Sequence, residues 1–417
     1  MSRFLFFASD YKPKPGGIAA YLDTLARALI GLGNTVHVLG VIPPEDTQRL
    51  EFLQNYEPWV TPFVAVYDKR PKSWAGNSFV SALEMLRCSS PLLQPVLDRT
   101  SHFRSSAAWV AKFVEILNER KPDMVVLGHL DINQYPLVLA LIRNRVPYGI
   151  IAHDFEVHKF VGRQNDLFRR GMMLKEAAWI AANSRYTRSE LQEWKIADEK
   201  ILLVPPPISD EAVRQSVQHK SVTNGRIFTL TTICRVIKEK GIDIVLRALK
   251  ILKTQGVLPR YVIAGDGSDR EFFQNLAVEL EVEDQVHFAG YISESKKWCL
   301  LRSADVFVMP SRVAPDQQHE GFGIAYIEAN ACGIPAVGTR AGGIPDAIID
   351  GETGMLVDPE SPEKLAEALF FLYHHPERRR QMGEAGMCRA RKQFSPAIVA
   401  LQFQEEVTKR LGKSNTH

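Results

Sequence analysis

The stretch "RFLFFASDYKPKPGGIAAYLDTLARALIGLGNTVHVLGV", residues 3–41, has the pattern that decides the fold. Residues 3–9 form an apolar run, a loop rich in Gly, Pro and Lys follows, and residues 35–41 form a second apolar run. Between them, residues 18–32 carry apolar side chains at helical spacing, and Gly33 ends the helix. The side chains expected on one face of it are Ile18, Tyr21, Leu22, Leu25, Leu29 and Leu32. A strand, a helix and a second strand in this order predict a parallel sheet covered by helices.

The same alternation continues along the chain and divides it in two. At 417 residues the chain exceeds what one hydrophobic core usually holds. Further strands are predicted at residues 123–128, 148–153, 179–184 and 200–205, and then at 226–234, 260–265, 285–290, 305–310 and 334–339. Three prolines and a polar run separate the two series. We predict an α/β fold with a Rossmann-like domain over 1–205, a linker over 206–225 and a second Rossmann-like domain over 222–394, followed by a helical tail.

Composition excludes several classes of protein. A net charge of +3 gives no reason to expect nucleic acid as a partner. The five cysteines are scattered without a C-x-x-C motif, which is typical of reduced thiols rather than of a disulfide framework or a zinc site. The first residues do not resemble a signal peptide, and no stretch approaches the roughly 18 apolar residues of a spanning helix. These features predict a soluble cytoplasmic chain, and they are compatible with a peripheral position at the inner face of the membrane.

Candidate site residues lie where predicted strands end, because ligands of open α/β sheets bind outside the carboxyl ends of the strands. Gly16 and Gly17 precede the first helix, whose amino end favours an anion, although glycines there are also common for steric reasons. His153 ends a strand predicted to be central, and a lone histidine is more often structural than catalytic. In "AGDGSDRE" (264–271), Gly265 is expected in a tight turn, and the spacing does not match a dinucleotide fingerprint.

Two further loops predict a site for a sugar joined to a phosphate. In "ICRVIKEKGID" (233–243), Arg235 and Lys240 would suit a diphosphate, with Lys238 as a competing lysine. In "EGFGIAYIE" (320–328), a helix is expected to begin near Gly323, and its amides would face an anion. Glu320 and Glu328 on either side would accept hydrogen bonds from sugar hydroxyls. The alternative is an ordinary capping acid and a solvated helix acid.

These stretches together resemble the retaining glycosyltransferases of the GT-B fold, in family 4 of those enzymes. The resemblance follows the chain in order through "GGIAAY" (16–21), His153, "ANSRYTRSEL" (182–191), residues 235–241 and "VHFAGYI" (286–292). It ends with the E-x7-E of residues 320–328 and "AGGIPDAIIDGETGMLVDP" (341–359). Within the family, "HDFEV" and "EGFGIAYIEANACGIP" look most like the phosphatidylinositol-mannoside mannosyltransferases and related users of GDP-mannose. Asp346 departs from the family's usual glutamate, with little consequence expected.

The resemblance implies a role for each candidate. Two Rossmann-like domains would face each other across a cleft, and a final helix at 395–417 would cross back to the first domain. The implied catalytic residues are His153 near the reacting carbon, Glu320 on the donor sugar, and Arg235 and Lys240 on the diphosphate. The implied donor-binding residues are Gly16, Gly17, Arg235, Lys240, Gly265, Tyr291 near the base, Glu320, Gly321, Phe322, Gly323, Ile324, and Glu328 on the ribose.

The expected function is therefore retaining transfer of a hexose from a nucleotide-diphosphate sugar to a hydroxyl of a glycan, lipid-linked or small-molecule acceptor. GDP-mannose is the favoured donor and a UDP-sugar the next. No cofactor and no obligatory metal are expected, since no D-x-D pair lies in a suitable loop. The alternatives are a nucleotide-sugar epimerase of the same fold and a non-catalytic scaffold that binds a nucleotide sugar. A glycoside hydrolase would need no cations for a diphosphate, and a phosphorylase of this fold would need pyridoxal phosphate.

Residues 68–112 form a basic segment, with seven Lys or Arg against three acids and apolar residues between them. Basic residues among apolar anchors suit an anionic membrane or an acceptor that carries phosphate. The alternative is a set of ordinary helices whose apolar faces are buried. We hypothesise that this segment forms the acceptor side of the site.

Overall fold

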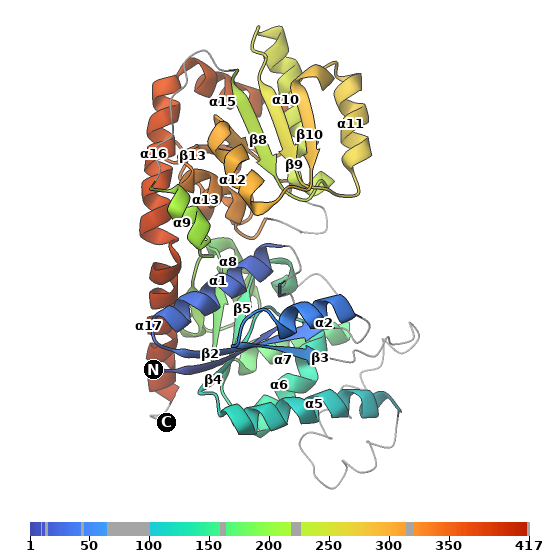
Figure 1. Cartoon of the computed structure of the whole chain (residues 1–417), viewed down its shortest axis with the longest axis vertical. Coiled ribbons are helices and arrows are strands. Elements are labelled where there is room, and N and C mark those ends of the chain that lie inside the picture. Colours follow the sequence, from blue (N-terminus) through green and yellow to red (C-terminus); the bar gives the residue numbers. More distant parts are fainter. Residues whose placement is uncertain are drawn as a thin grey trace. The chain divides into compact units, whose positions relative to one another are not determined.

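The computed structural model describes residues 1–9, 11–12, 16–42, 46–64, 101–158, 164–217, 227–313 and 320–414. The chain forms two compact α/β units, each with a parallel sheet and covering helices (Figure 1). The first unit contains Met1–Asn183, Thr187–Val204 and Ala400–His417, and the second contains Ser184–Tyr186 and Pro205–Val399. This architecture is the predicted α/β class.

The first unit is built on a seven-stranded parallel sheet with the order β3-β2-β1-β4-β5-β6-β7. Its strands are β1 (Arg3–Ala8), β2 (Thr35–Ile42), β3 (Val60–Val64), β4 (Met124–Leu127), β5 (Tyr148–Ala152), β6 (Trp179–Ala182) and β7 (Ile201–Leu203). The helices are α1 (Gly17–Gly31), α2 (Thr47–Gln54), α5 (Ser101–Arg120), α6 (Tyr135–Arg143), α7 (Gln164–Glu176) and α8 (Arg185–Glu193). Every residue of β4 and β5 is buried, as expected for strands with helices on both faces.

Helix α1 matches the predicted helix except at its end. Tyr21, Leu22, Leu25 and Leu29 are buried, as the helical spacing predicts. The prediction that Leu32 belongs to the helix was wrong by one residue, because the helix ends at Gly31 and Leu32, in the capping position, is 38% exposed. A helical pattern stops governing burial once the backbone leaves the helix.

The second unit is built on a six-stranded parallel sheet with the order β10-β9-β8-β11-β12-β13. Its strands are β8 (Thr229–Ile233), β9 (Arg260–Ala264), β10 (Val286–Gly290), β11 (Val306–Val308), β12 (Ala336–Thr339) and β13 (Gly354–Val357). Its helices are α9 (Asp210–Gln215), α10 (Ile242–Thr254), α11 (Arg270–Glu279), α12 (Glu294–Ser303), α13 (Ile324–Ala331), α14 (Ile344–Ala347), α15 (Pro362–His374) and α16 (Pro376–Gln393).

The stretch expected to be a linker, residues 206–225, is partly structured. Ser209 caps α9 by accepting a hydrogen bond from the amide of Ala212. Ile208 and Ala212 are buried in the core of the second unit together with residues of α13. The proline-rich run therefore leads directly into packed structure, at least as far as residue 215.

The final helix, α17 (Pro396–Ser414), begins in the second unit and from Ala400 packs in the first. Phe403 lies against Phe4 and Trp179, with ring centroids 6.1 and 5.3 Å apart. Gln404 accepts a hydrogen bond from the side-chain amide of Asn34 at 2.8 Å. The end of the chain thus completes the core of the first unit.

Two predictions bear on membranes. Among the described residues, no helix has the length and apolar character that crossing a membrane requires. Most of the basic segment, residues 68–100, lies outside the described residues, so its proposed contact with an acceptor or a membrane stays a prediction.

Candidate functional site

The second sheet has a topological switch point between its two central strands. From β8 the strand order runs outward to β9 and β10, and from β11 it runs the other way to β12 and β13. The loops after β8 and β11 therefore leave the sheet in opposite directions from adjacent positions, which is where open α/β sheets bind ligands. The first of these loops carries Arg235 and Lys240, and the second carries Glu320 and the start of α13.

Lys240 and Glu320 come together at this point. The ammonium nitrogen of Lys240 lies 2.6 Å from a carboxylate oxygen of Glu320, and their side chains are only 19% and 17% exposed. Burial lowers the pKa of Lys240, but the facing carboxylate raises it by more, so the net pKa is raised and the lysine keeps its charge. The two residues are 80 positions apart, and the sequence predicted both without predicting that they form a pair.

The competing lysine, Lys238, is directed elsewhere. Its ammonium nitrogen lies 4.7 Å from the centre of the Phe272 ring, and its backbone amide donates to Asp269. Lys238–Lys240 is a single 3-10 turn, closed by Gly241 in the left-handed conformation. Arg235, at the start of the same loop, is exposed.

Arg312, which the sequence analysis missed, ties the two loops together. Its backbone amide donates to the carbonyl of Glu239 at 2.9 Å, and its guanidinium binds Asp243 at 2.5 Å. The guanidinium also binds Glu360 at 2.8 Å. Arg312 therefore holds the lysine-bearing turn beside the segment that follows β11.

The start of α13 presents backbone amides at the same edge of the sheet. Gly323 caps the helix with φ of 87°, and Ile324 is its first residue, close to the start predicted from the sequence. Phe322 is buried, with its ring centroid 5.7 Å from that of Phe394. Gly321 packs so tightly on Gly343 that a Cβ on Gly343 would lie 1.9 Å from the Gly321 carbonyl oxygen. The helix start is thus held rigidly in a position that suits an anion.

Glu328 has a partner that sequence reasoning also missed. Lys297 of α12 lies 2.9 Å from its carboxylate, and both side chains are about one-seventh exposed, at 14% and 15%. Burial raises the pKa of Glu328, and Lys297 opposes this rise only in part. Burial lowers the pKa of Lys297, but Glu328 and Glu294 together raise it by more, so this lysine stays charged.

The two remaining candidates of the second unit lie at the carboxyl ends of their strands. Gly265 follows β9, and a Cβ there would lie 1.8 Å from the carbonyl oxygen of Cys234. The backbone of this turn therefore packs directly against the residue that follows β8. Tyr291 follows the edge strand β10 and is 78% exposed. A role of Tyr291 beside a base stays a prediction.

In the first unit, His153 lies where β5 ends, and its ring is fixed. Its Nε2 is 2.8 Å from the carbonyl oxygen of Gly128, which can only accept, so the proton of this bond is on Nε2. The ring packs edge-on against Tyr21 of α1 at 5.4 Å. Gly16, with φ of 155°, caps α1, and Gly17 is the first residue of that helix. His153 and these two glycines therefore lie at the same edge of the first sheet.

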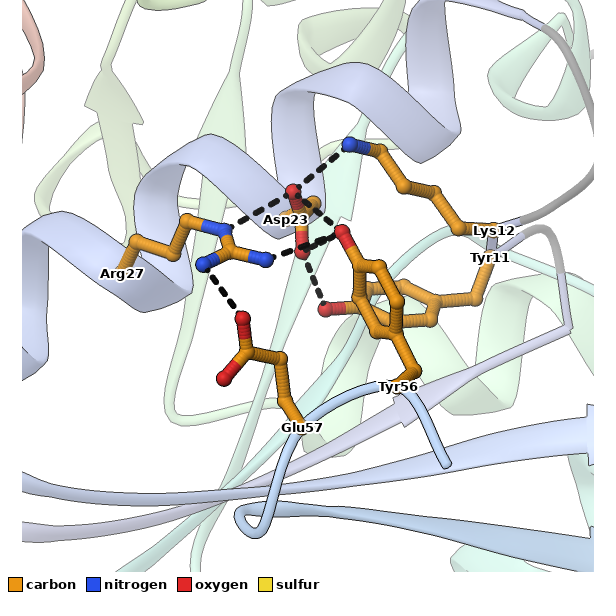
Figure 2. Close-up of polar contacts among 6 residues, drawn as sticks. All are labelled: Tyr11, Lys12, Asp23, Arg27, Tyr56 and Glu57. Carbon is orange, nitrogen blue, oxygen red and sulfur yellow. Dashed lines mark hydrogen bonds and ion pairs between the residues drawn. The ribbon is translucent and has the colours of Figure 1, made fainter. Parts of the chain in front are cut away.

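A buried carboxylate anchors the chain before those glycines (Figure 2). Asp23 of α1 accepts hydrogen bonds from the hydroxyl groups of Tyr11 and Tyr56, at 2.8 and 3.2 Å. It also pairs with Lys12 at 2.9 Å and with Arg27 at 3.1 Å. Since Tyr11 and Lys12 follow β1 closely, Asp23 fixes the start of the loop that leads to Gly16.

Metal ligands are not grouped in the parts of the chain that the structure describes. There, no three His, Cys, Asp or Glu side chains come together as a metal site would require. Transfer without a metal stays a prediction, to be tested below.

Two Rossmann-like units, one with fixed cations and a helix start at its switch point, define the class of two-domain α/β transferases with the GT-B fold. Residues 214–388 match the sequence model of "Glycosyl transferases group 1", and residues 15–212 match that of "Glycosyltransferase Family 4". A GDP-mannose-dependent alpha-(1-6)-phosphatidylinositol monomannoside mannosyltransferase of Mycobacterium tuberculosis is 30% identical over 399 residues, covering 93% of each chain. The chain belongs to glycosyltransferase family 4.

Other comparisons agree on the family and the fold. The mannosyltransferase of the same name from Mycolicibacterium smegmatis is 32% identical over 210 residues, 49% of this chain and 55% of that relative. The Anabaena protein HepE, solved with UDP and glucose, superimposes with a TM-score of 0.70 at 19% identity, covering 98% of this chain and all of HepE. Sucrose-phosphate synthase from Thermosynechococcus elongatus gives 0.71 at 19% identity, over 99% and 100% of the two chains. The predicted family and GT-B fold are confirmed.

Proposed function

We propose that this glycosyltransferase moves a hexose from a nucleotide-diphosphate sugar to a hydroxyl of a glycan or lipid-linked acceptor, with retention of the anomeric configuration. Lys240 and Arg235 bind the diphosphate, Glu320 and the amides at the start of α13 hold the sugar, and Glu328 binds the ribose. His153 contacts the sugar near the reacting carbon. No metal takes part.

The observation that carries the proposal is the pair of Lys240 and Glu320 at the switch point. Breaking the anomeric bond places new negative charge on the departing diphosphate, and a fixed cation in a sheltered position stabilises that charge. Lys240 is such a cation, since it is charged and four-fifths buried. Glu320 neutralises it in the free protein, and the same carboxylate accepts hydrogen bonds from a sugar placed beside the diphosphate.

GDP-mannose is the proposed donor. The support is the name of the Mycobacterium tuberculosis relative, which aligns with nearly the whole of this chain. HepE was solved with UDP, and at 19% identity its likeness concerns the fold alone. The first experiment therefore determines which base and which sugar the donor carries.

A screen of donors tests the proposal. Purified protein is incubated with GDP-mannose, UDP-glucose or UDP-N-acetylglucosamine, with a phosphatidylinositol-mannoside or a simple glycan as acceptor, and the new linkage is assigned by NMR. We expect an α-linked product from GDP-mannose. Transfer only from a uridine nucleotide would refute the donor, a β-linked product would refute retention, and a donor epimerised without acceptor would refute transfer.

Two further measurements test the roles. Arg235→Ala is expected to lower turnover about 100-fold by removing charge that stabilises the leaving group. Arg247→Ala, on another exposed arginine, in α10, is the control and should leave turnover unchanged. Excess EDTA should also leave turnover unchanged, and a loss restored by a divalent cation would contradict metal-independent transfer.

A further inference from the structure

The segment after β5 carries a second histidine, His158, five residues beyond His153 and fully buried. Its Nε2 lies 3.1 Å from the carboxylate of Asp154, and its Nδ1 lies 2.9 Å from the carboxylate of Glu190 in α8. A neutral imidazole has one N–H, and an ionised carboxylate can only accept a hydrogen bond. Both bonds form together with ionised carboxylates only when His158 is the doubly protonated imidazolium.

The surrounding charges favour that form. Burial lowers the pKa of His158, but Asp154 and Glu190 raise it by more, so the net pKa is raised. Two charged groups of the described residues face the ring, Asp154 of its own segment at Nε2 and Glu190 of α8 at Nδ1, and His158 and Asp154 each make further contacts. Glu156 is directed to backbone amides, and Arg170 of α7 interacts with Glu156.

The same segment fixes His153. The backbone amides of His153 and Asp154 donate to the two carboxylate oxygens of Glu156, at 2.6 and 3.2 Å. Asn183 donates to the carbonyl of His153 at 2.6 Å. Asp154 is the next residue after His153, so the ion pair that holds Asp154 to His158 also limits how far His153 can move.

We infer that His158 is a positioning residue whose imidazolium fastens the segment of His153 to α8 through Asp154 and Glu190. This inference rests on the proposed role of His153 in transfer. When His158 loses its proton, one of its nitrogens can no longer donate, and one of the two carboxylates loses its hydrogen bond from the ring. The fastening is therefore complete at low pH and is lost as the pH rises through the raised pKa of His158.

The charge of His158 can be measured without turnover. With ¹⁵N-labelled protein, the ring nitrogens of each histidine are followed by NMR from pH 5 to pH 9. We expect both nitrogens of His158 to be protonated at pH 6, and the ring signals of His153 to shift when His158 deprotonates as the pH rises. A His158 that is neutral at pH 6, or a His153 that is unaffected by its deprotonation, would overturn the inference even in a protein that transfers no sugar.

Transfer kinetics give the second test. We expect kcat of the wild type to fall at alkaline pH with the titration of His158. Glu190→Gln keeps an acceptor oxygen but removes a charge, so the alkaline fall should move to lower pH. His158→Gln should lower kcat about tenfold and abolish that fall, since a modest misplacement of a reacting group costs about this much. Affinity for GDP or UDP, whose proposed contacts are mainly in the second unit, should be unchanged.

His37→Gln is the matched control. His37 of β2 is a part-buried histidine of the same unit. Its Nε2 forms a hydrogen bond of 2.9 Å with the hydroxyl of Thr61. This variant should keep both the wild-type kcat and the alkaline fall. An alkaline fall that stays at the same pH in Glu190→Gln would refute the positioning role. If His158→Gln does not fold, the Glu190→Gln profile and the wild-type NMR titration still decide the question.

Discussion

Lys240→Met gives the sharpest test of the candidate site, because methionine keeps most of the stem and removes the charge. Loss of a principal electrostatic contact to the leaving group is expected to lower kcat about 100-fold, or about 2.7 kcal/mol of transition-state stabilisation. The variant also leaves the carboxylate of Glu320, 17% exposed, without its partner at 2.6 Å. Losing one charge-assisted hydrogen bond in this setting should lower the free energy of unfolding by about 2 kcal/mol.

The control is Lys250→Met in the same unit. Lys250 pairs with Glu281 at 2.7 Å, almost the same distance, but the side chains are 40% and 73% exposed. An exposed pair contributes at most about 1 kcal/mol, and Lys250 lies on α10, so this variant should be stable and fully active. Turnover is measured with the best donor of the screen, unfolding with urea, and affinity for the nucleoside diphosphate by calorimetry.

The outcome separates two explanations of the pair. If Lys240 only stabilises the fold, the variant unfolds more easily but its folded fraction turns over normally. If Lys240 serves the diphosphate, kcat and nucleotide affinity both fall in fully folded protein. Turnover within roughly threefold of the wild type, which is less than 1 kcal/mol, would refute the assigned role.

Three other variants follow from contacts described above. Asp23→Asn should lower the free energy of unfolding at pH 7 by about 2 kcal/mol. Burial raises the pKa of Asp23, but its partners lower it by more, so the net pKa is lowered. The stability of the wild type should therefore fall as the pH falls through that pKa, and urea unfolding of the variant should show less of this fall. Gly343→Ala places a Cβ 1.9 Å from a backbone oxygen of the loop after β11 and should lower kcat at least about tenfold, whereas Gly31→Ala, in open space, should have no effect. Lys297→Met should raise the pKa of Glu328 further, because Lys297 opposes the effect of burial. On acidification, Glu328 of the variant is then protonated at a higher pH than in the wild type, and calorimetry should show that nucleotide affinity is lost at that higher pH.

The fold could be predicted from the sequence because parallel strands buried on both faces appear as continuous apolar runs. The runs at 148–153 and 179–184 lie within one residue of β5 and β6 at their starts. Segments interrupted by proline or glycine gave no such signal. β3 contains a proline in "VTPFV", and β13, "GMLV", begins with a glycine, so neither was recognised as a strand.

The candidate site was predicted only where strand ends marked it. Lys240 and Glu320 lie in loops that follow strands, and ligands of open α/β sheets bind at such loops. Lys297, Arg312 and His158 were missed because nothing in the local pattern distinguishes them. Lys297 lies in a helix next to another lysine, Lys296, as a solvated lysine does, and its partner Glu328 is 31 residues away. Such partnerships are set by tertiary packing, which spacing along one chain does not encode.

The sequence "KEK" offers two lysines, Lys238 and Lys240, as candidates for the diphosphate, and only the backbone conformation distinguishes them. Lys238 and Lys240 are equivalent by sequence, with the same charge and almost the same place in the loop. In a 3-10 turn, with three residues per turn, side chains two positions apart leave the axis about 120° apart and point in different directions. Lys238 lies over Phe272, while Lys240 lies on the side of Glu320. The turn can end there because Gly241 adopts φ of 70°, and a Cβ at that position would lie 2.0 Å from the carbonyl oxygen of Pro310. Gly241 therefore allows the turn to end against Pro310, with Lys240 paired to Glu320 at the switch point.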